Sequence, residues 1–226
     1  MNSKRKHPVA QIERGKKVLL SGEADISLTK ILSSENCQKI LNECREFRDR
    51  IYPPIKTLFM FIKQVLNPDK SCRKAVAGSI AEQIEEGKEI SSNNTGPYCK
   101  ARQRLPETAV KALVKEVGES ATKQTPASWQ VYGREVKLVD GSMVTMADSK
   151  ENQGVYPQHS NQKEGAGFPL ARLVVVMSLT VGTVVDYAVG AFKGKGTGEH
   201  SLLRSIFDCI NEEDILLGDR YYPSFF

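Results

Sequence analysis

The first half of the chain repeats apolar residues three and four positions apart, which is the period of an amphipathic helix. Ser34 and Ser71 each precede such a stretch, where a serine can cap a helix start, and Gly118 follows the last stretch, where glycine commonly ends a helix. We expect four helices, over residues 35–47, 54–66, 72–86 and 107–117. Their buried stripes include Ile40, Leu41, Cys44, Phe47, Val65, Ile84, Leu113 and Val117. A further short helix is expected after the turn at 91–96.

The pattern changes to strands after Trp129. Short runs of aliphatic and β-branched residues predict strands over 135–140, 172–179, 184–189 and 215–217, with a helix over 199–210 before the last of them. The turn at Gly182 predicts a hairpin between the second and third strands. A helix between the third and fourth strands predicts a right-handed crossover that brings the last strand beside the first. The expected fold is therefore α+β or α/β, with a helical module followed by a mixed sheet.

Composition narrows the class of protein. The chain has 226 residues, 40% hydrophobic and 26% charged, as in soluble globular proteins. It offers no apolar run long enough to cross a bilayer and no secretory signal, so we expect a cytoplasmic protein that is not bound to membrane. Its five cysteines are scattered and odd in number, without a Cys-x-x-Cys pair, so we expect half-buried thiols rather than disulfides or a zinc site.

The positive charge is concentrated in places that suit a nucleic acid. The net charge is +5, and residues 1–26 form a basic segment without periodicity, which we interpret as a flexible arm. Lys100, Arg102 and Arg104 alternate on the expected short helix after the 91–96 turn, as in a helix-turn-helix variant. An exposed basic helix face without a partner is the alternative interpretation. Lys163, Lys193 and Lys195 stand in polar loops where they could contact DNA, or merely solvent.

Two aspartates follow two of the expected strands. Asp140 and Asp219 are 219 − 140 = 79 residues apart, and each comes directly after an apolar run. If those strands are parallel neighbours, both carboxylates emerge at one edge of the sheet. Such a pair suits Mg²⁺ or Mn²⁺, because hard cations prefer oxygen ligands and relieve the repulsion between the acids. The alternative is ordinary turn chemistry, in which aspartate bonds the backbone after a strand.

Sequence around the acids resembles the DDE transposases of bacterial insertion sequences, most closely the insertion-sequence-four group. The similar stretches are Val139–Ser142, Leu217–Tyr222, Gly165–Pro169, Gly194–Glu199 and Asn94–Pro106, in family order. The resemblance covers residue 27 to the end. It implies a ribonuclease H-like domain that cuts DNA at the element's ends and joins the freed 3′ hydroxyl to a target.

The resemblance also assigns roles and partners. It implies that Asp140 and Asp219 are the first two acids of a metal-binding triad for two-metal catalysis. The third is a glutamate in a Tyr…Arg…Glu…Lys signature, and no segment of this sequence matches it. We therefore expect the catalytic domain to be incomplete and this chain to be inactive alone. The implied partner is double-stranded DNA, both element ends and target, and the implied full-length enzyme is a DNA-bound dimer associated with the nucleoid.

These inferences give three expected regions: a basic arm (1–26), a helical DNA-binding domain (27–128) and the first part of a ribonuclease H-like domain (129–226). Two other functions stay open. One is a non-enzymatic DNA-binding remnant or regulator that occupies the element's ends without cutting. The other is a generic magnesium phosphohydrolase, which would leave the basic helical module without a purpose.

Overall fold

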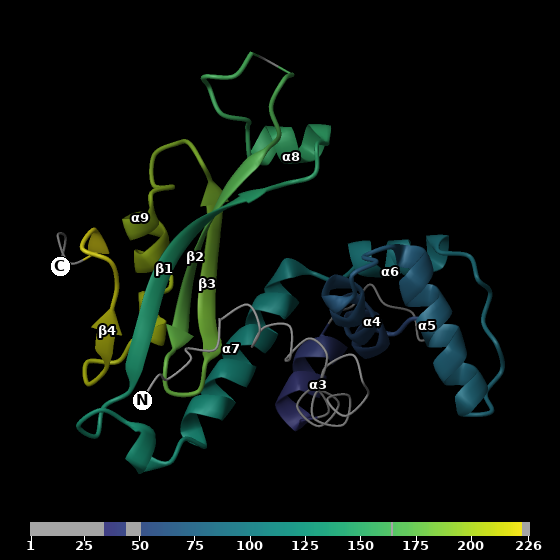
Figure 1. The fold of residues 1–226 in the computed structure, drawn as a ribbon, viewed down its shortest axis with the longest axis horizontal. Helices are drawn as coiled ribbons and strands as arrows, with labels where there is room; N and C mark the ends of the chain where they lie inside the picture. The colour runs from purple at the N-terminus through teal and green to yellow at the C-terminus, as the bar shows by residue number, and fades with distance from the viewer. Residues whose placement is uncertain (1–33, 44–50, 164, 223–226) are drawn as a thin grey trace, which may run out of the picture. The chain divides into compact units, whose positions relative to one another are not determined.

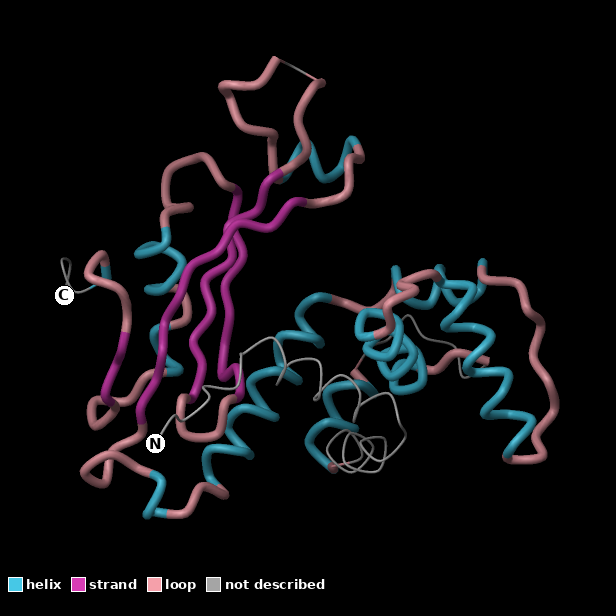
Figure 2. Tube along the Cα trace, in the orientation of Figure 1, coloured by secondary structure: helices cyan, strands magenta, loops and turns pink. Residues whose placement is uncertain are grey.

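The computed structural model describes residues 34–43, 51–163 and 165–222. The expected basic arm and the positions of Cys44 and Phe47 lie outside these residues. The chain divides into two compact units, one ending at Ala112 and the other beginning at Leu113. This boundary falls inside a helix, whereas the sequence placed the end of the helical domain at residue 128. Within the described residues there are seven α-helices and one four-stranded sheet (Figures 1 and 2).

The helical unit contains the helices that the sequence predicted. They are α3 (Glu35–Asn42), α4 (Pro54–Leu66), α5 (Cys72–Glu85), α6 (Gly96–Gln103) and the start of α7 (Glu107–Lys123). Both expected serine caps form: Ser34 Oγ accepts a hydrogen bond from the Cys37 N–H at 3.4 Å, and Ser71 Oγ accepts one from Lys74 at 3.1 Å. The core of the unit comprises Tyr52, Met60, Val76, Tyr98 and Ala101.

Two apolar side chains of the expected stripes are not in this core. Val65 is 51% exposed and Ile84 is 57% exposed. Both lie in the last turn of their helix, α4 or α5. Helical spacing shows which residues share a face, but a face is buried only where another element covers it. The prediction that these two residues are buried was therefore wrong.

The second unit is built on a mixed sheet in the order β3-β2-β1-β4. Its strands are β1 (Val136–Thr145), β2 (Leu170–Ser178), β3 (Thr183–Ala191) and β4 (Ile215–Leu217). The first three strands pair antiparallel, and β4 pairs parallel with β1, as expected (Figure 1). The hairpin turn between β2 and β3 contains Gly182 at φ 67°, a conformation that suits glycine.

A short helix supplies much of the core beside the sheet. In α9 (Glu199–Arg204), Leu202 and Leu203 pack with Val139, Val174 and Val176. The helix is shorter than the expected 199–210, because the backbone at Ile206 leaves helical geometry at φ −125° and a 3-10 turn (Phe207–Cys209) follows. Ile206 stays buried after the break, whereas Phe207 is 39% exposed.

The second part of α7 packs against β3. A Cβ added at Gly118 would lie 2.6 Å from the Val184 carbonyl oxygen and 2.7 Å from Val185 Cα, so only glycine allows this approach. The helix continues past Gly118 to Lys123, so the prediction that Gly118 ends the helix was wrong. Its role is close packing rather than capping.

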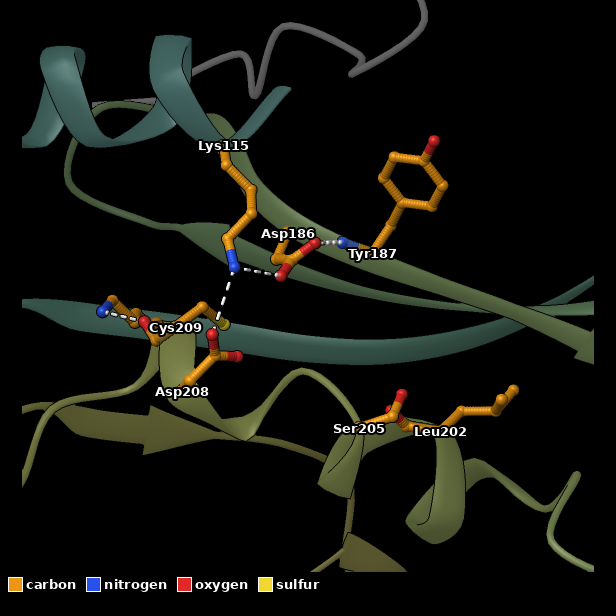
Figure 3. Close-up of polar contacts among 8 residues, drawn as sticks. Lys115, Asp186, Tyr187, Leu202, Ser205, Asp208 and Cys209 are labelled. Carbon is orange, nitrogen blue, oxygen red and sulfur yellow. Dashed lines mark hydrogen bonds and ion pairs between the residues drawn. The ribbon is translucent and has the colours of Figure 1, made fainter. Parts of the chain in front are cut away.

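An ion pair also anchors α7. Lys115 Nζ lies 3.2 Å from Asp186 Oδ2 on β3 and 3.2 Å from Asp208 Oδ2 in the 3-10 turn (Figure 3). Asp186 is fully buried, whereas Asp208 is exposed. A second buried pair joins Lys137 Nζ of β1 to Asp214 Oδ2 at 2.6 Å. These pairs tie one helix and two connections to the sheet.

Candidate functional site

Asp140 lies on β1, and Asp219 follows its parallel neighbour β4 by two residues. Val136 pairs with Ile215, an offset of 215 − 136 = 79 residues, and the same offset relates Asp140 to Asp219. The register of β1 and β4 therefore brings both acids to the same level of the sheet. This pairing was the condition for the proposed acid pair.

The sequence predicted that Asp140 comes at the end of its strand. In the structure Asp140 lies inside β1. The strand β1 continues to Thr145, because β2 pairs with it from Ser178 to Leu170. Burial explains the error: β1 is mostly buried up to Val139 and mostly exposed from Asp140 onward. The apolar pattern marked the buried half of β1 and missed its solvent-exposed half.

Each aspartate bonds its own backbone through one carboxylate oxygen. Asp140 Oδ1 accepts from the Gly141 N–H at 2.9 Å, and Asp219 Oδ1 accepts from the Tyr221 N–H at 2.9 Å. Both side chains are exposed. The bond at Asp219 spans two residues, as in an Asx turn. The turn chemistry that was the alternative is thus present, and it uses Oδ1 of each carboxylate.

A buried tyrosine lies among the acids. Tyr222 is 3% exposed, and its hydroxyl donates a hydrogen bond to Glu199 Oε2 at 3.3 Å. Burial, and then the negative charges of Glu199, Asp140 and Asp219, raise the pKa of Tyr222 well above its ordinary value. Three carboxylates therefore act on one phenol, which stays protonated.

Glu199 is a third acid near the aspartate pair, and all three raise the pKa of Tyr222. Glu199 is the first residue of α9, and its carboxylate lies against Gly141, where an added Cβ would meet Glu199 Cδ at 2.5 Å. Arg172 Nε lies 3.9 Å from Glu199 Oε1, and Arg172 Nη1 donates to the Thr197 carbonyl at 2.9 Å. Glu199 is therefore held between a tyrosine and an arginine at the level of Asp140.

No role for Glu199 or Tyr222 was predicted from the sequence. The available signals were an acid at a helix start after a glycine-rich turn, and a tyrosine three residues after Asp219. Neither signal specifies a partner, because the contact between them joins residues 23 positions apart. Only the packing of α9 beside the sheet brings them together.

The donor set suits a hard cation in its chemistry. Asp140 and Asp219 offer carboxylate oxygens at one level of adjacent strands, and Mg²⁺ is commonly bound by one or two carboxylates with water completing its shell. No group of three His, Cys, Asp or Glu side chains in the described residues is arranged to hold a metal ion. The geometry therefore offers two protein ligands, with Glu199 engaged by Tyr222 and Arg172.

The basic residues of the helical unit differ in their surroundings. Lys100 is exposed on α6, whereas Arg104 is partly buried. The Arg102 guanidinium lies over the Phe61 ring at 4.8 Å and donates to Gln64 Oε1 at 3.0 Å. Arg102 thus takes part in the packing of its own unit, and Lys100 is the most accessible cation of the three.

The loop lysines lie beyond the end of the sheet toward which β1 and β4 run. Lys163 belongs to the connection between β1 and β2, and Lys193 and Lys195 to the connection after β3, and all three are exposed. The two connections meet where the His159 ring lies 5.2 Å from the Phe192 ring. The structure therefore groups these loops at that end of the sheet, whereas Asp140 lies in the middle of β1 and Asp219 lies two residues after β4.

The connection that carries Lys163 is more ordered than a long polar loop. It contains α8 (Lys150–Val155), which Ser149 caps by accepting from the Asn152 N–H at 3.2 Å. Gln158 then bridges the loop, accepting from the Gly165 N–H and donating to the Lys163 carbonyl. The sequence predicted neither α8 nor this bridge.

The sequence matches no protein-family model and no curated protein. None of the helices in the described ranges combines the length and apolar character needed to span a membrane.

Proposed function

We propose that this chain is the DNA-binding and metal-binding part of a transposase of the insertion-sequence type, with a ribonuclease H-like catalytic domain. The observation that carries the proposal is the parallel pairing of β1 with β4, which puts Asp140 and Asp219 at one level of the sheet. Two acids so placed can hold Mg²⁺ or Mn²⁺ against a phosphodiester, where the ion stabilises the developing charge on the oxygens. The resemblance around both acids supplies the reaction: cleavage at the element's ends and strand transfer.

The surroundings of the acids support a phosphodiester substrate. Lys163, Lys193 and Lys195 belong to exposed loops beyond the sheet end toward which β1 and β4 run, and phosphate contacts by lysine provide affinity without reading the sequence. Lys100 on α6 provides a second basic position in the helical unit. In this proposal the sheet unit holds the DNA at the cut, and the helical unit contacts the element's terminal DNA.

Metal binding tests the acid pair directly. Mn²⁺ is titrated into the wild type, Asp140→Asn, Asp219→Asn and the control Asp148→Asn, with calorimetry as the measurement. Asp148 is an exposed acid of the same unit whose Oδ1 accepts from Gln153, a bond that asparagine can keep. We expect at least about a tenfold loss of affinity in either site variant, because one carboxylate remains to hold the ion. Equal Mn²⁺ affinity in the wild type and Asp219→Asn would refute the metal site.

DNA binding is tested by its dependence on salt. The logarithm of affinity for a duplex should fall with the logarithm of salt concentration by about 0.9 for each phosphate contacted. Replacing Lys163, Lys193 and Lys195 with Ala should flatten that slope by about this amount for each lysine that contacts a phosphate. Lys123→Ala serves as the control, since Lys123 is exposed but pairs with Glu119 on α7. A slope unchanged in the triple variant would remove these loops from the interface.

A non-cleaving DNA-binding regulator is the second candidate function. The backbone hydrogen bonds at both aspartates favour it, because Oδ1 of each carboxylate accepts from a neighbouring N–H, as in ordinary turn chemistry. Incubation of the chain with duplex DNA and Mn²⁺ distinguishes the two functions. Nicking that is lost in both Asp140→Asn and Glu199→Gln would assign the third acid to Glu199. Binding without nicking would favour the regulator.

A further inference from the structure

Two cysteines of the helical unit lie in contact. Cys72 is the first residue of α5, and Cys99 lies in α6. The Cys99 thiol donates a hydrogen bond to Cys72 Sγ, with 3.5 Å between the two sulfurs. Both side chains are partly exposed, and both thiols are free. A disulfide bond needs sulfurs about 2.05 Å apart, so a movement of roughly 1.5 Å would join them.

The two sulfurs differ in their hydrogen bonding. Besides Cys99, Arg102 Nη1 approaches Cys72 Sγ at 3.4 Å and Gln64 Nε2 approaches it at 3.6 Å. Three donors, one of them a cation, therefore converge on the Cys72 sulfur at the start of α5. The hydrogen bond to Cys72, and then burial, raise the pKa of the Cys99 thiol. Cys99 is the donor of the pair and Cys72 Sγ is the acceptor beside the Arg102 cation, so we take Cys72 as the attacking sulfur.

The cation beside Cys72 is held in place. The Arg102 guanidinium lies over Phe61 at 4.8 Å and over Tyr98 at 5.8 Å, and its Nη1 also donates to Gln64 Oε1. Tyr98 is fully buried, and its hydroxyl donates to the same Gln64 oxygen at 2.8 Å. This fixed arrangement keeps the positive charge next to one sulfur rather than between the two.

We propose that Cys72 and Cys99 are a redox-responsive thiol pair that a small-molecule disulfide such as oxidised glutathione converts into a reversible bond between α5 and α6. Cys72 loses its proton to solvent, and its sulfur attacks one sulfur of glutathione disulfide, whose S–S bond breaks and releases one glutathione thiolate. Cys99 then loses its proton to solvent, and its sulfur attacks Cys72 Sγ and expels the second glutathione. The two protein thiols are oxidised, and one glutathione disulfide is reduced to two thiols.

The other described cysteines lack these features. Cys37 is 1% exposed. Burial and then the charge of nearby Asp186 raise the pKa of Cys209 to about 11, which keeps that thiol protonated and unreactive. Among the four described cysteines, oxidation is therefore expected at the pair in the helical unit. The new bond changes the sulfur to which Arg102 donates, and it restrains α6, the helix that carries Lys100. It therefore also alters this basic helix. This inference does not depend on the proposed function.

The experiment counts thiols after exposure to oxidised glutathione and then denaturation. The wild type has five cysteines and should fall to 5 − 2 = 3 reactive thiols, with peptide mass spectrometry locating a Cys72–Cys99 link. Cys209→Ser, the control, should fall from four to two. Cys72→Ser should keep four thiols, because Cys99 alone does not react. Cys99→Ser should fall from four to three and carry one glutathione on Cys72.

The Cys72→Ser and Cys99→Ser variants, which cannot form this disulfide, test the proposal even where the disulfide itself destabilises the unit. A wild-type count that stays at five would overturn it. So would equal glutathione addition to Cys72 in Cys99→Ser and to Cys99 in Cys72→Ser, or a link that joins any other pair. Addition of dithiothreitol should restore all five thiols of the wild type, and an irreversible loss would also contradict the proposal.

Discussion

The two units bury polar groups in different ways. The sheet unit buries charges in pairs: Asp186 with Lys115, and Lys137 with Asp214. The helical unit gathers the Tyr98 hydroxyl, the Gln64 amide and two thiols around a single cation, Arg102. In these two pairs of the first unit, a buried carboxylate lies beside a lysine. In the second, one acceptor oxygen or sulfur is shared by several donors.

This difference predicts how the stability of each unit responds to substitutions. Removing one member of a buried ion pair leaves an uncompensated charge, so the sheet unit should respond strongly to single substitutions. Sharing of acceptors means that the helical unit should tolerate the loss of one donor, because Gln64 Oε1 keeps another. Its sensitivity should instead be chemical, to oxidation.

The largest expected effect is that of Asp214→Ala. Both side chains of the Lys137–Asp214 pair are 5% exposed, and the change leaves a buried lysine without its carboxylate. The free energy of unfolding should fall by about 3–5 kcal/mol, measured by urea denaturation. Glu213→Ala is the neighbouring control: its pair with Arg134 is 3.7 Å long and solvent-exposed, so its loss should stay within about 1 kcal/mol. Similar losses in the two variants would contradict the contrast.

Glycine-to-alanine changes in one helix of each unit should have opposite signs. Gly118→Ala puts a methyl group against the backbone of β3 and should destabilise by about 1–3 kcal/mol. Gly78→Ala in α5 meets nothing within 4 Å and should stabilise by up to about 1 kcal/mol, because alanine favours a helix. Thermal unfolding of both variants measures the signs. A stabilised Gly118→Ala protein would mean that α7 does not approach the sheet as described.

The smallest effect is expected from Tyr98→Phe. The change removes the hydroxyl that donates to Gln64 Oε1 at 2.8 Å, but Arg102 still donates to that oxygen. The cost at neutral pH should therefore be about 1 kcal/mol, measured by urea denaturation. A loss of several kcal/mol would show that the shared acceptor does not protect the helical unit.

The same tyrosine should make the helical unit sensitive to alkali. Burial raises the pKa of Tyr98 from 10.0 to about 12. Because the folded pKa lies above the unfolded one, this stability is fully present below pH 10 and is lost as the pH rises toward 12. Tyr98→Phe should remove this part of the loss. Lys115 of the sheet unit also has a raised pKa, so its contribution to the stability of the protein is lost as the pH rises. The test is therefore the difference in stability between wild type and Tyr98→Phe.

Local signals predicted most of the elements of both units. Proline, serine and glycine at helix ends, together with apolar periods, gave α3, α4, α5 and the starts of α6 and α7. The errors share a physical cause. Val65 and Ile84 follow the helical period but have no covering element, and Gly118 has the composition of a helix end but the packing of a helix interior. Periodicity describes one element, whereas burial requires two.

The candidate site divides in the same way. The spacing of Asp140 and Asp219 and the strand–helix–strand order could both be read from the sequence. Because that order strongly restricts how the last strand can enter the sheet, the observed parallel pairing of β1 with β4 agrees with the prediction. Three contacts depend instead on tertiary packing: Tyr222 with Glu199, Arg102 with Gln64, and Cys72 with Cys99. Such contacts join residues 23 to 38 positions apart, and they form only when packed elements bring particular side chains within hydrogen-bonding distance.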